Sequence, residues 1–201
     1  MASAALLARF GIFVRKGLLD PDLCQRLSAE MRSASRHPAT VRAISEDGVA
    51  DEVDEEHRRT QMAEVSEASV ALIEERLLGV KPALEEHFSM QLSTLQPPQF
   101  LVYREGDFFR AHIDNASERL AGDRVARRRL SVVMFVNSGE SEYGGGALTF
   151  YGLLDQDARG ESVGIPLAGA PGLFVAFRSG TVHSVTPVTA GERCTVVSWL
   201  A

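Results

Sequence analysis

The chain has 201 residues, of which 45% are hydrophobic and 24% are charged, the proportions of an ordinary globular protein. This length predicts a single domain with room for a substantial core. The formal net charge of -6 at pH 7 argues against a nucleic-acid partner, because phosphate binding usually needs a basic face.

The cysteines and the N-terminus bear on the compartment. Cys24 and Cys194 are the only two cysteines, and thiols so far apart form neither a disulfide framework nor a zinc–thiolate site. We therefore expect a reducing, cytoplasmic compartment. The opening MASAALLARFG has a short apolar run without basic residues before it, so no signal peptide is expected. No apolar run approaches the ~20 residues that a membrane span needs, and nothing in the sequence indicates an oligomeric state.

The first predicted elements are a short strand and a helix. Residues 10–14 suggest the strand. Asp20-Pro21 predicts the start of a helix that runs to about Ser35, because a carboxylate caps the free N–H groups and proline suits the first helical position. One apolar stripe follows at helical spacing, formed by Leu23, Leu27 and Met31.

A strand over 41–45 and an acidic segment come next. Residues 46–56 carry seven carboxylates in eleven positions. This composition favours a solvated, mobile loop, and the alternative is a lid that attracts a cationic substrate. Arg58-Arg59-Thr60 returns to a strand-like pattern.

More helix completes the first half. A second amphipathic helix is predicted over 66–78 and should end at Gly79. Residues 81–88 suggest a short third helix. Pro97-Pro98 marks the break between the halves. Residues 1–97 are thus predicted to form a helical support region that includes the acidic loop.

The second half, residues 98–201, is predicted to be a β-rich core. Short runs of strand formers are separated by Gly and Asp turns, and no helical segments alternate with them. This arrangement favours a sandwich or jelly roll, so the expected fold class is α+β, mainly β. The eight predicted strands span 99–104, 108–113, 129–136, 146–151, 163–167, 172–177, 182–185 and 193–200.

An H-x-D motif, His112 to Asp114, ends the stretch FLVYREGDFFRAHID. On a strand, these two side chains would point to the same face. His183 is the other histidine of the β-rich half. Two histidines and one carboxylate, with three coordination positions open, form the facial triad of non-haem Fe(II) oxygenases. Zinc accepts the same ligands, so the triad alone leaves the metal open. The remaining histidines are expected to be exposed polar residues: His37, His57 and His87.

Arg193 narrows the interpretation of this triad. It opens the last predicted strand, which is otherwise apolar, so its guanidinium must either reach solvent or meet an anion. Together with the triad, a guanidinium that grips a carboxylate through two hydrogen bonds is the better account.

Motifs along most of the chain resemble those of the Fe(II)/2-oxoglutarate-dependent dioxygenases, in particular the prolyl 4-hydroxylase-like branch. The fold implied by this resemblance is a double-stranded β-helix, or jelly roll, supported by N-terminal helices. The motifs are LLDPDLCQRL, R-R-T, ALIEERL, Y-x-x-G-D-x-x-x-x-H-x-D, G-G-x-L and H-x-x-x-P-V-x-x-G-x-R.

The resemblance also implies roles for individual residues. His112, Asp114 and His183 match the iron ligands. Arg193 matches the basic residue that binds the distal carboxylate of 2-oxoglutarate. Tyr103 matches a tyrosine whose hydroxyl lies against this cosubstrate, although a half-buried strand aromatic would explain it equally simply. Two further residues resemble pocket walls, Leu148 and Trp199.

One position departs from the family pattern. Some relatives use a second tyrosine hydroxyl on the strand after H-x-D to bind the distal carboxylate. The matching residue here is Phe135. Ser131 would share its face by strand alternation and could supply a hydroxyl.

The implied cofactors are Fe(II), 2-oxoglutarate as cosubstrate and O2, and ascorbate is a further one that the family allows. The implied reaction hydroxylates an unactivated C–H bond while 2-oxoglutarate becomes succinate and carbon dioxide. Its substrate is expected to be a prolyl or other residue of a peptide or protein, with a free amino acid or another small molecule as the alternative.

Segments 46–56 and 137–146 are expected to frame the pocket mouth. Residues 115–129 would be a surface loop or a substrate clamp.

Two competing functions remain. A cupin-like metalloenzyme that does not use 2-oxoglutarate would share the jelly roll, but it gives Arg193 and Tyr103 no task. A non-catalytic binding module would leave the convergence of three metal-type residues unexplained.

Overall fold

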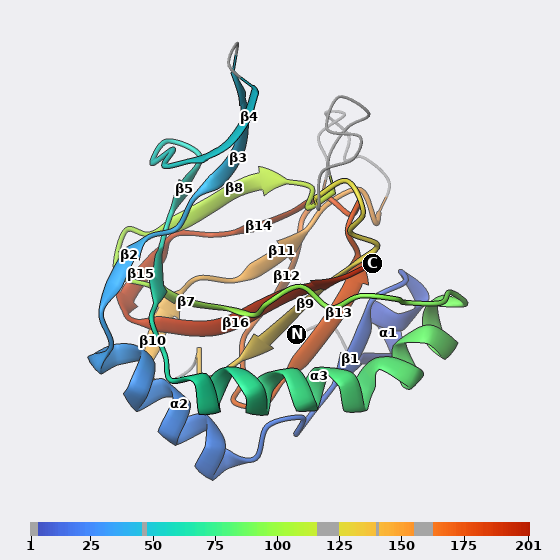
Figure 1. Ribbon diagram of the computed structural model, residues 1–201, viewed down its shortest axis with the longest axis horizontal. Helices are drawn as coiled ribbons and strands as arrows, with labels where there is room; N and C mark the ends of the chain where they lie inside the picture. The colour runs from blue at the N-terminus through green and yellow to red at the C-terminus, as the bar shows by residue number, and fades with distance from the viewer. Residues whose placement is uncertain (1–3, 46–47, 116–124, 140, 155–162) are drawn as a thin grey trace.

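Two antiparallel sheets face each other and helices cover the outside of one of them (Figure 1). The computed structural model describes residues 4–45, 48–115, 125–139, 141–154 and 163–201, with the side chains of residues 4–6 and 42–50 excepted. The predicted class, mainly β with supporting helices, is confirmed.

The larger sheet has seven strands and the smaller has five. In spatial order the larger sheet contains β1 (Phe13–Arg15), β13 (Phe174–Arg178), β9 (Leu130–Phe135), β16 (Arg193–Leu200), β7 (Gln99–Tyr103), β6 (Gln61–Ala63) and β2 (Arg36–Pro38). The smaller sheet contains β12 (Ile165–Leu167), β11 (Leu148–Phe150), β14 (His183–Val185), β8 (Phe108–His112) and β5 (Arg58–Arg59). Two ribbons accompany them, β3 (Val41–Ser45) with β4 (Gly48–Glu52) and β10 (Tyr143–Gly145) with β15 (Val188–Gly191).

Side-chain alternation along the central strands builds two layers of core. On β9, Val132 and Met134 pack toward the helices, whereas Val133 and Phe135 pack toward the smaller sheet. Successive residues of a strand point to opposite faces, so a strand that is buried on both sides has to be apolar throughout. All six residues of β9 are buried accordingly, from Leu130 to Phe135.

Helix α2 (Pro21–Ser33) follows the prediction closely. The Asp20 carboxylate accepts a hydrogen bond from the Leu23 backbone N–H at 2.8 Å, as an N-cap should. The predicted stripe of Leu23, Leu27 and Met31 is at most 3% exposed. Together with α3 (Glu67–Phe88), this helix covers the outer face of the larger sheet (Figure 1).

Helix α3 (Glu67–Phe88) corrects the prediction that Gly79 ends a helix and that a separate one follows. One buried stripe continues through Ile73, Leu77, Val80, Leu84 and Phe88, so packing on the sheet favours a single helix over the local preferences of Gly79 and Pro82. Pro82 removes the hydrogen bond to the carbonyl of Leu78, a residue whose side chain is 54% exposed, where water can replace the lost donor.

Several elements near the N-terminus were not predicted. Helix α1 (Ala4–Arg9) precedes β1, which begins three residues later than expected. Residues 48–52 of the acidic segment form a strand rather than a loop, while residues 46 and 47 lie outside the described residues. Strand β5, which pairs with β8, agrees with the strand-like pattern predicted at 58–60, whereas β6, beside β7, was not predicted.

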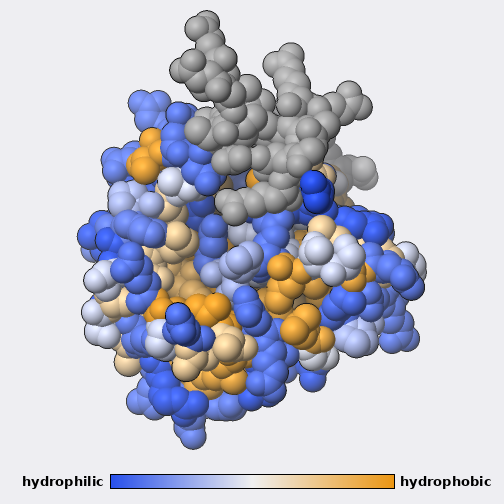
Figure 2. Space-filling view, viewed as in Figure 1, coloured by the Kyte–Doolittle hydropathy of each residue, from blue (hydrophilic) through white to orange (hydrophobic). Residues whose placement is uncertain are grey.

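Hydrophilic residues cover much of the surface, and the hydrophobic ones on the face shown in Figure 2 gather in its lower half, where α2 and α3 lie. No helix within the described residues has both the length and the apolar character of a membrane span.

The turn before β13 offers a test of the fold. Gly172 has φ +73° and an added Cβ would lie 2.3 Å from the backbone oxygen of Leu19. Gly11 has nearly the same φ, +72°, with no atom within 4 Å of the added Cβ. We expect Gly11→Ala to lower the free energy of unfolding by about 1–2 kcal/mol and Gly172→Ala to lower it by about 3 kcal/mol or more, because a backbone clash adds to the same strain. Urea unfolding of both variants measures this, and equal losses would contradict the described packing.

Candidate active site

His112, Asp114 and His183 converge between the two sheets. His112 ends β8 and lies directly opposite His183, which begins β14. The ligand atoms of the three residues all lie within 4.8 Å of one another. Nε2 of His112 is 3.5 Å from Oδ1 of Asp114, and Nε2 of His183 is 3.5 Å from its Oδ2. The three predicted metal ligands therefore form one cluster that could hold an ion.

Asp114 reaches this cluster by a different route from the one predicted. Strand β8 ends at His112, so strand alternation does not orient Asp114. A bend follows, in which the Asp114 backbone N–H donates to the carbonyl of Ser179 at 2.8 Å. This bond ties the bend to the turn that precedes His183, and so links two of the candidate ligands.

Both imidazole rings are held in the orientation that metal binding needs. Nδ1 of His112 lies 2.7 Å from the carbonyl of Arg110, and Nδ1 of His183 lies 2.9 Å from that of Thr181. A carbonyl only accepts hydrogen bonds, so Nδ1 carries the proton and the lone pair of Nε2 faces Asp114. Two neutral imidazoles and one carboxylate suit Fe(II) as ligands, so the residues fit the metal that the family resemblance implies.

The pKa shifts of His183 and Asp114 agree with a metal-binding arrangement of these side chains. Burial lowers the pKa of His183 to about 4, although the Asp114 carboxylate opposes the shift. Burial alone would raise the pKa of Asp114, but the neighbouring His183, His112 and Ser131 side chains outweigh it and hold the pKa well below its usual range. At neutral pH the cluster thus offers a neutral His183 and an ionised Asp114, the states that bind metal.

An aromatic ring supports His112 from one side. The Phe109 ring is stacked on the His112 ring, with centroids 3.5 Å apart and an angle of 17° between the planes. Between the pairs His183–His112 and Val185–Phe109, two residues of β8 oppose one of β14. The extra residue forms a β-bulge, which turns Phe109 and His112 to the same face. Sequence alternation could not reveal this contact.

The cluster opens into a cavity of about 480 Å³ between the sheets, a size typical of small-molecule sites. Every pocket residue predicted from the sequence lies in its wall, namely Tyr103, Ser131, Leu148, Arg193 and Trp199. His57 also lines it with its ring centroid 6.4 Å from that of His112, so the expectation that His57 is merely an exposed polar residue is wrong.

Arg193 is a buried cation at the inner part of this cavity, with 1% of its surface exposed. Its guanidinium carbon lies 4.9 Å from the Tyr103 ring centroid and 5.2 Å from that of Phe135. Its Nη1 donates to the Thr195 hydroxyl at 3.0 Å, while its Nε has no hydrogen-bond partner in the described structure. A charge buried in this way needs an anion, which the cavity is large enough to admit.

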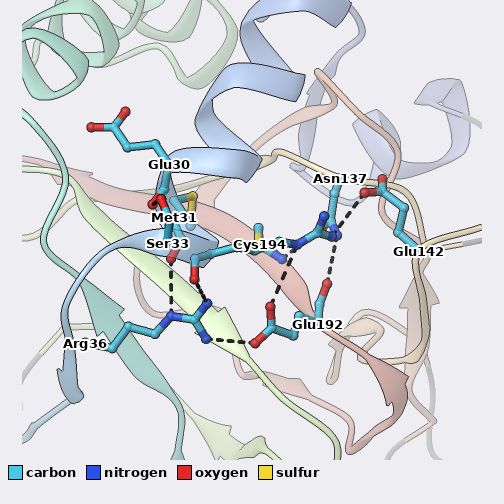
Figure 3. A network of polar contacts seen from close by, with 9 residues as sticks. Glu30, Met31, Ser33, Arg36, Asn137, Glu142, Glu192 and Cys194 are labelled. Atoms are coloured by element: carbon cyan, nitrogen blue, oxygen red, sulfur yellow. Dashed lines mark hydrogen bonds and ion pairs between the residues drawn. The ribbon is translucent and has the colours of Figure 1, made fainter.

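A polar network on the helix side anchors the backbone around Arg193 (Figure 3). The Asn137 side chain donates to the Glu192 carbonyl and accepts from the Cys194 N–H, both at 2.8 Å, so it brackets the arginine. The Glu192 carboxylate in turn pairs with Arg36 at 2.8 Å. The start of β16 is therefore tied to the segment that follows α2.

Tyr143 lies beside Arg193 and was not predicted. Its hydroxyl is buried without a hydrogen-bond partner in the described structure and interacts with the Arg193 guanidinium. An added Cβ at Gly169 would lie 2.3 Å from both the Tyr143 hydroxyl and the Phe135 ring, which places these two side chains next to each other. Burial raises the pKa of Tyr143 although Arg193 opposes the shift, so the phenol keeps its proton.

The Tyr143 phenol, on β10 of the neighbouring ribbon, lies next to the Phe135 ring, so it is placed to offer the hydroxyl that Phe135 lacks. Ser131 was the alternative considered from the sequence. Its hydroxyl donates instead to the Ser179 hydroxyl at 3.0 Å, and Ser131 contributes to the lowered pKa of Asp114. Only the position of Tyr143 just before Gly144-Gly145-Gly146 hinted at its place near the pocket.

Residues 98–201 match the sequence profile of the 2OG-Fe(II) oxygenase superfamily. The chain belongs to this superfamily. Membership implies Fe(II), 2-oxoglutarate and O2 as cofactor and cosubstrates, as predicted, and the metal cluster and Arg193 both lie within the matched residues.

Curated relatives of this oxygenase are PKHD-type hydroxylases. One from Shewanella oneidensis is 41% identical over 104 residues, 52% of this chain and 42% of the relative. Another from Shewanella baltica is 35% identical over 146 residues, 71% of this chain and 59% of the relative. The chain thus spans about half the length of the curated relatives that it matches.

Solved structures confirm the double-stranded β-helix. A Pseudomonas putida prolyl-4-hydroxylase has a TM-score of 0.66 and 25% identity, and covers 96% of this chain and 94% of its own. A Trichoplax adhaerens prolyl hydroxylase, in complex with a hypoxia inducible factor peptide fragment, has a TM-score of 0.67 and 16% identity, with 98% and 86% covered. At that identity the second comparison shows the fold alone.

The segments expected at the pocket mouth have different outcomes. Asp51, Glu52 and Asp54 of the acidic segment do line the cavity. In the segment 137–146, β10 pairs with β15, so this part is a paired strand rather than an open loop. Of segment 115–129, interpreted as a surface loop or a substrate clamp, residues 116–124 lie outside the described residues, while Asn115, Val125 and Arg128 line the cavity.

Metal binding can be tested through stability. Mn(II), a redox-stable probe, should raise the melting temperature of the metal-free protein by about 5–10 °C at 100 times its Kd, because it binds only the folded state. His183→Ala should abolish this shift, whereas His87→Ala, on the exposed side of α3, should retain it. Thermal scans with and without Mn(II) measure this, and a shift retained in His183→Ala would place the metal elsewhere.

Proposed function

We propose that this oxygenase hydroxylates an unactivated C–H bond of a prolyl or other residue in a peptide or protein. In this proposal His112, Asp114 and His183 hold Fe(II), and Arg193 and Tyr103 bind 2-oxoglutarate. The single observation that carries it is the presence of the three-ligand cluster and the buried Arg193 guanidinium in one cavity. A metal site without a cosubstrate would leave this cation without an anion.

When bound, Fe(II) and 2-oxoglutarate supply the oxidising chemistry, with dioxygen consumed and succinate and carbon dioxide released. The protein binds and orients the cosubstrate. Arg193 offers the free edge of its guanidinium to the distal carboxylate, and the Tyr143 hydroxyl donates a further hydrogen bond where the family uses a tyrosine at the position of Phe135. Tyr103, whose ring lies over Arg193, fixes the plane of that guanidinium.

The walls of the cavity keep water away from the reacting groups. Leu148, Val133 and Val197 contribute apolar surface to the cavity. In a dry cavity the attraction between a guanidinium and a carboxylate is stronger than in water. The same exclusion protects an oxidising centre from side reactions.

The substrate class rests on the likeness to the Pseudomonas putida prolyl-4-hydroxylase, which extends over nearly the whole of both chains. A free amino acid or another small molecule is the alternative, and the size of the cavity accommodates either. Succinate release from proline-containing peptides, compared with free amino acids, distinguishes the two. Turnover of free amino acids alone would contradict the peptide proposal.

Cosubstrate binding can be followed without a substrate. Anaerobic addition of 2-oxoglutarate to the Fe(II)-loaded protein should produce a visible charge-transfer absorption. Arg193→Ala should raise the Kd for 2-oxoglutarate about 10- to 100-fold, because a charge-assisted pair is lost. An absorption titration measures this Kd. No absorption in the iron-loaded wild type would contradict the proposal and favour a cupin-like metalloenzyme.

The contribution of Tyr143 has its own matched comparison. Tyr143→Phe should raise the Kd for 2-oxoglutarate about tenfold, the effect of one hydrogen bond to a charged group. Tyr151→Phe is the control, because the Tyr151 hydroxyl bonds to the Ser184 hydroxyl at 3.1 Å. Calorimetry on both variants, with Mn(II) in the site, measures binding directly. An unchanged Kd in Tyr143→Phe would show that its hydroxyl does not reach the cosubstrate.

A further inference from the structure

A second buried guanidinium, that of Arg58, lies in the wall of the same cavity. Arg58 belongs to β5, at the edge of the smaller sheet, and only 7% of its surface is exposed. Its partner across the strands is Phe109, and its guanidinium carbon lies 4.9 Å from the Phe109 ring centroid. Since Phe109 stacks on His112, Arg58 is separated from a candidate metal ligand by one aromatic ring.

The hydrogen bonds of Arg58 are incomplete. Its Nη1 donates to the Thr40 carbonyl at 2.8 Å, but its Nε is buried and has no partner within the described structure. None of the ion pairs found between described residues involves Arg58. A buried guanidinium without a carboxylate is costly in free energy, which indicates that an anion completes it when the site is filled.

The proposed cosubstrate does not supply that anion. Of its two carboxylates, one belongs at the metal cluster and the other at Arg193. Tyr103 has its ring against the Arg193 guanidinium and also interacts with Arg58, as does the nearby Asp114 carboxylate. The Asp114 carboxylate is already shared by two histidines. The remaining candidate is the molecule that is oxidised.

We propose that Arg58 binds a carboxylate of the substrate and thereby places the oxidised carbon beside the metal cluster. This inference rests on the proposed function, because it assigns the substrate class of that same cavity. The Nε edge of a guanidinium presents two parallel donors, which match the two oxygens of a carboxylate better than the single oxygen of an amide. The carboxylate can come from a chain terminus or from an acidic side chain.

The rim of the cavity restricts the kind of anion. Asp51 and Glu52 are exposed and Asp54 lies close by, all three lining the cavity. This acidic rim disfavours polyanions such as nucleotides through like-charge repulsion. A substrate with one carboxylate and a neutral or cationic remainder satisfies both the rim and Arg58.

The test uses matched probes on the anaerobic Fe(II)- and 2-oxoglutarate-loaded protein. N-acetyl-glycyl-proline is compared with its C-terminal amide, and an amidated proline peptide containing aspartate is compared with its asparagine counterpart. We expect calorimetry to show the free acid of at least one pair binding about tenfold or more tightly than the amide. The pair that shows the difference identifies the source of the carboxylate.

Arg58→Met should abolish the preference for the acid while changing the Kd for 2-oxoglutarate less than about threefold. Arg58→Lys keeps the charge and should restore part of the preference. Arg59→Met is the matched control, because Arg59 is the next residue of β5, is exposed, and lies over Phe108 at 5.6 Å. It should bind both probes as the wild type does.

Three outcomes would overturn the proposal. The first is that acid and amide bind with equal affinity, and the second is that no probe binds. The third is that Arg58→Met weakens the binding of 2-oxoglutarate and of the acid probe to the same extent, which would assign Arg58 to the cosubstrate. Thermal unfolding of each variant shows whether the fold is retained. Loss of the charge-transfer absorption in the wild type would instead refute the proposed function, so the two failures can be distinguished.

Discussion

The pairing of β8 with β14 is the constraint on which the site depends. Its register sets His112 opposite His183, and the bond from the Asp114 N–H to the Ser179 carbonyl brings the carboxylate between them. Because Nδ1 of each ring faces a backbone carbonyl, both Nε2 lone pairs point inward. The backbone of the smaller sheet and of the turn before β14 therefore determines the position, tautomer and direction of the candidate ligands together.

The larger sheet carries the other half of the chemistry. Pairing of β16 with β7 sets Arg193 opposite Tyr103, and the apolar strands of this sheet pack on α2 and α3. The cavity is what remains between the two sheets. Its two buried guanidinium groups, Arg193 and Arg58, lie on opposite walls, so each can recognise a separate anion.

The sequence predicted the residues of the candidate site more accurately than it predicted the bounds of the helices and strands. The H-x-D motif, His183 and Arg193 could be found because residue types at fixed spacings limit the chemistry. The continuous helix α3 could not, since packing overrides the local signals of Gly79 and Pro82. Sequence reasoning missed Tyr143 and Arg58 for another reason. Their proposed roles depend on buried polar atoms that lack hydrogen-bond partners, and such atoms can be identified only once distant strands lie side by side.

The most direct measurement is anomalous diffraction at the iron edge from a crystal grown anaerobically with Fe(II) and 2-oxoglutarate. The account predicts one strong peak within coordination distance of His112, Asp114 and His183, with the distal carboxylate of the cosubstrate at Arg193 and Tyr143. A peak at other residues, or a cosubstrate turned away from Arg193, would contradict it.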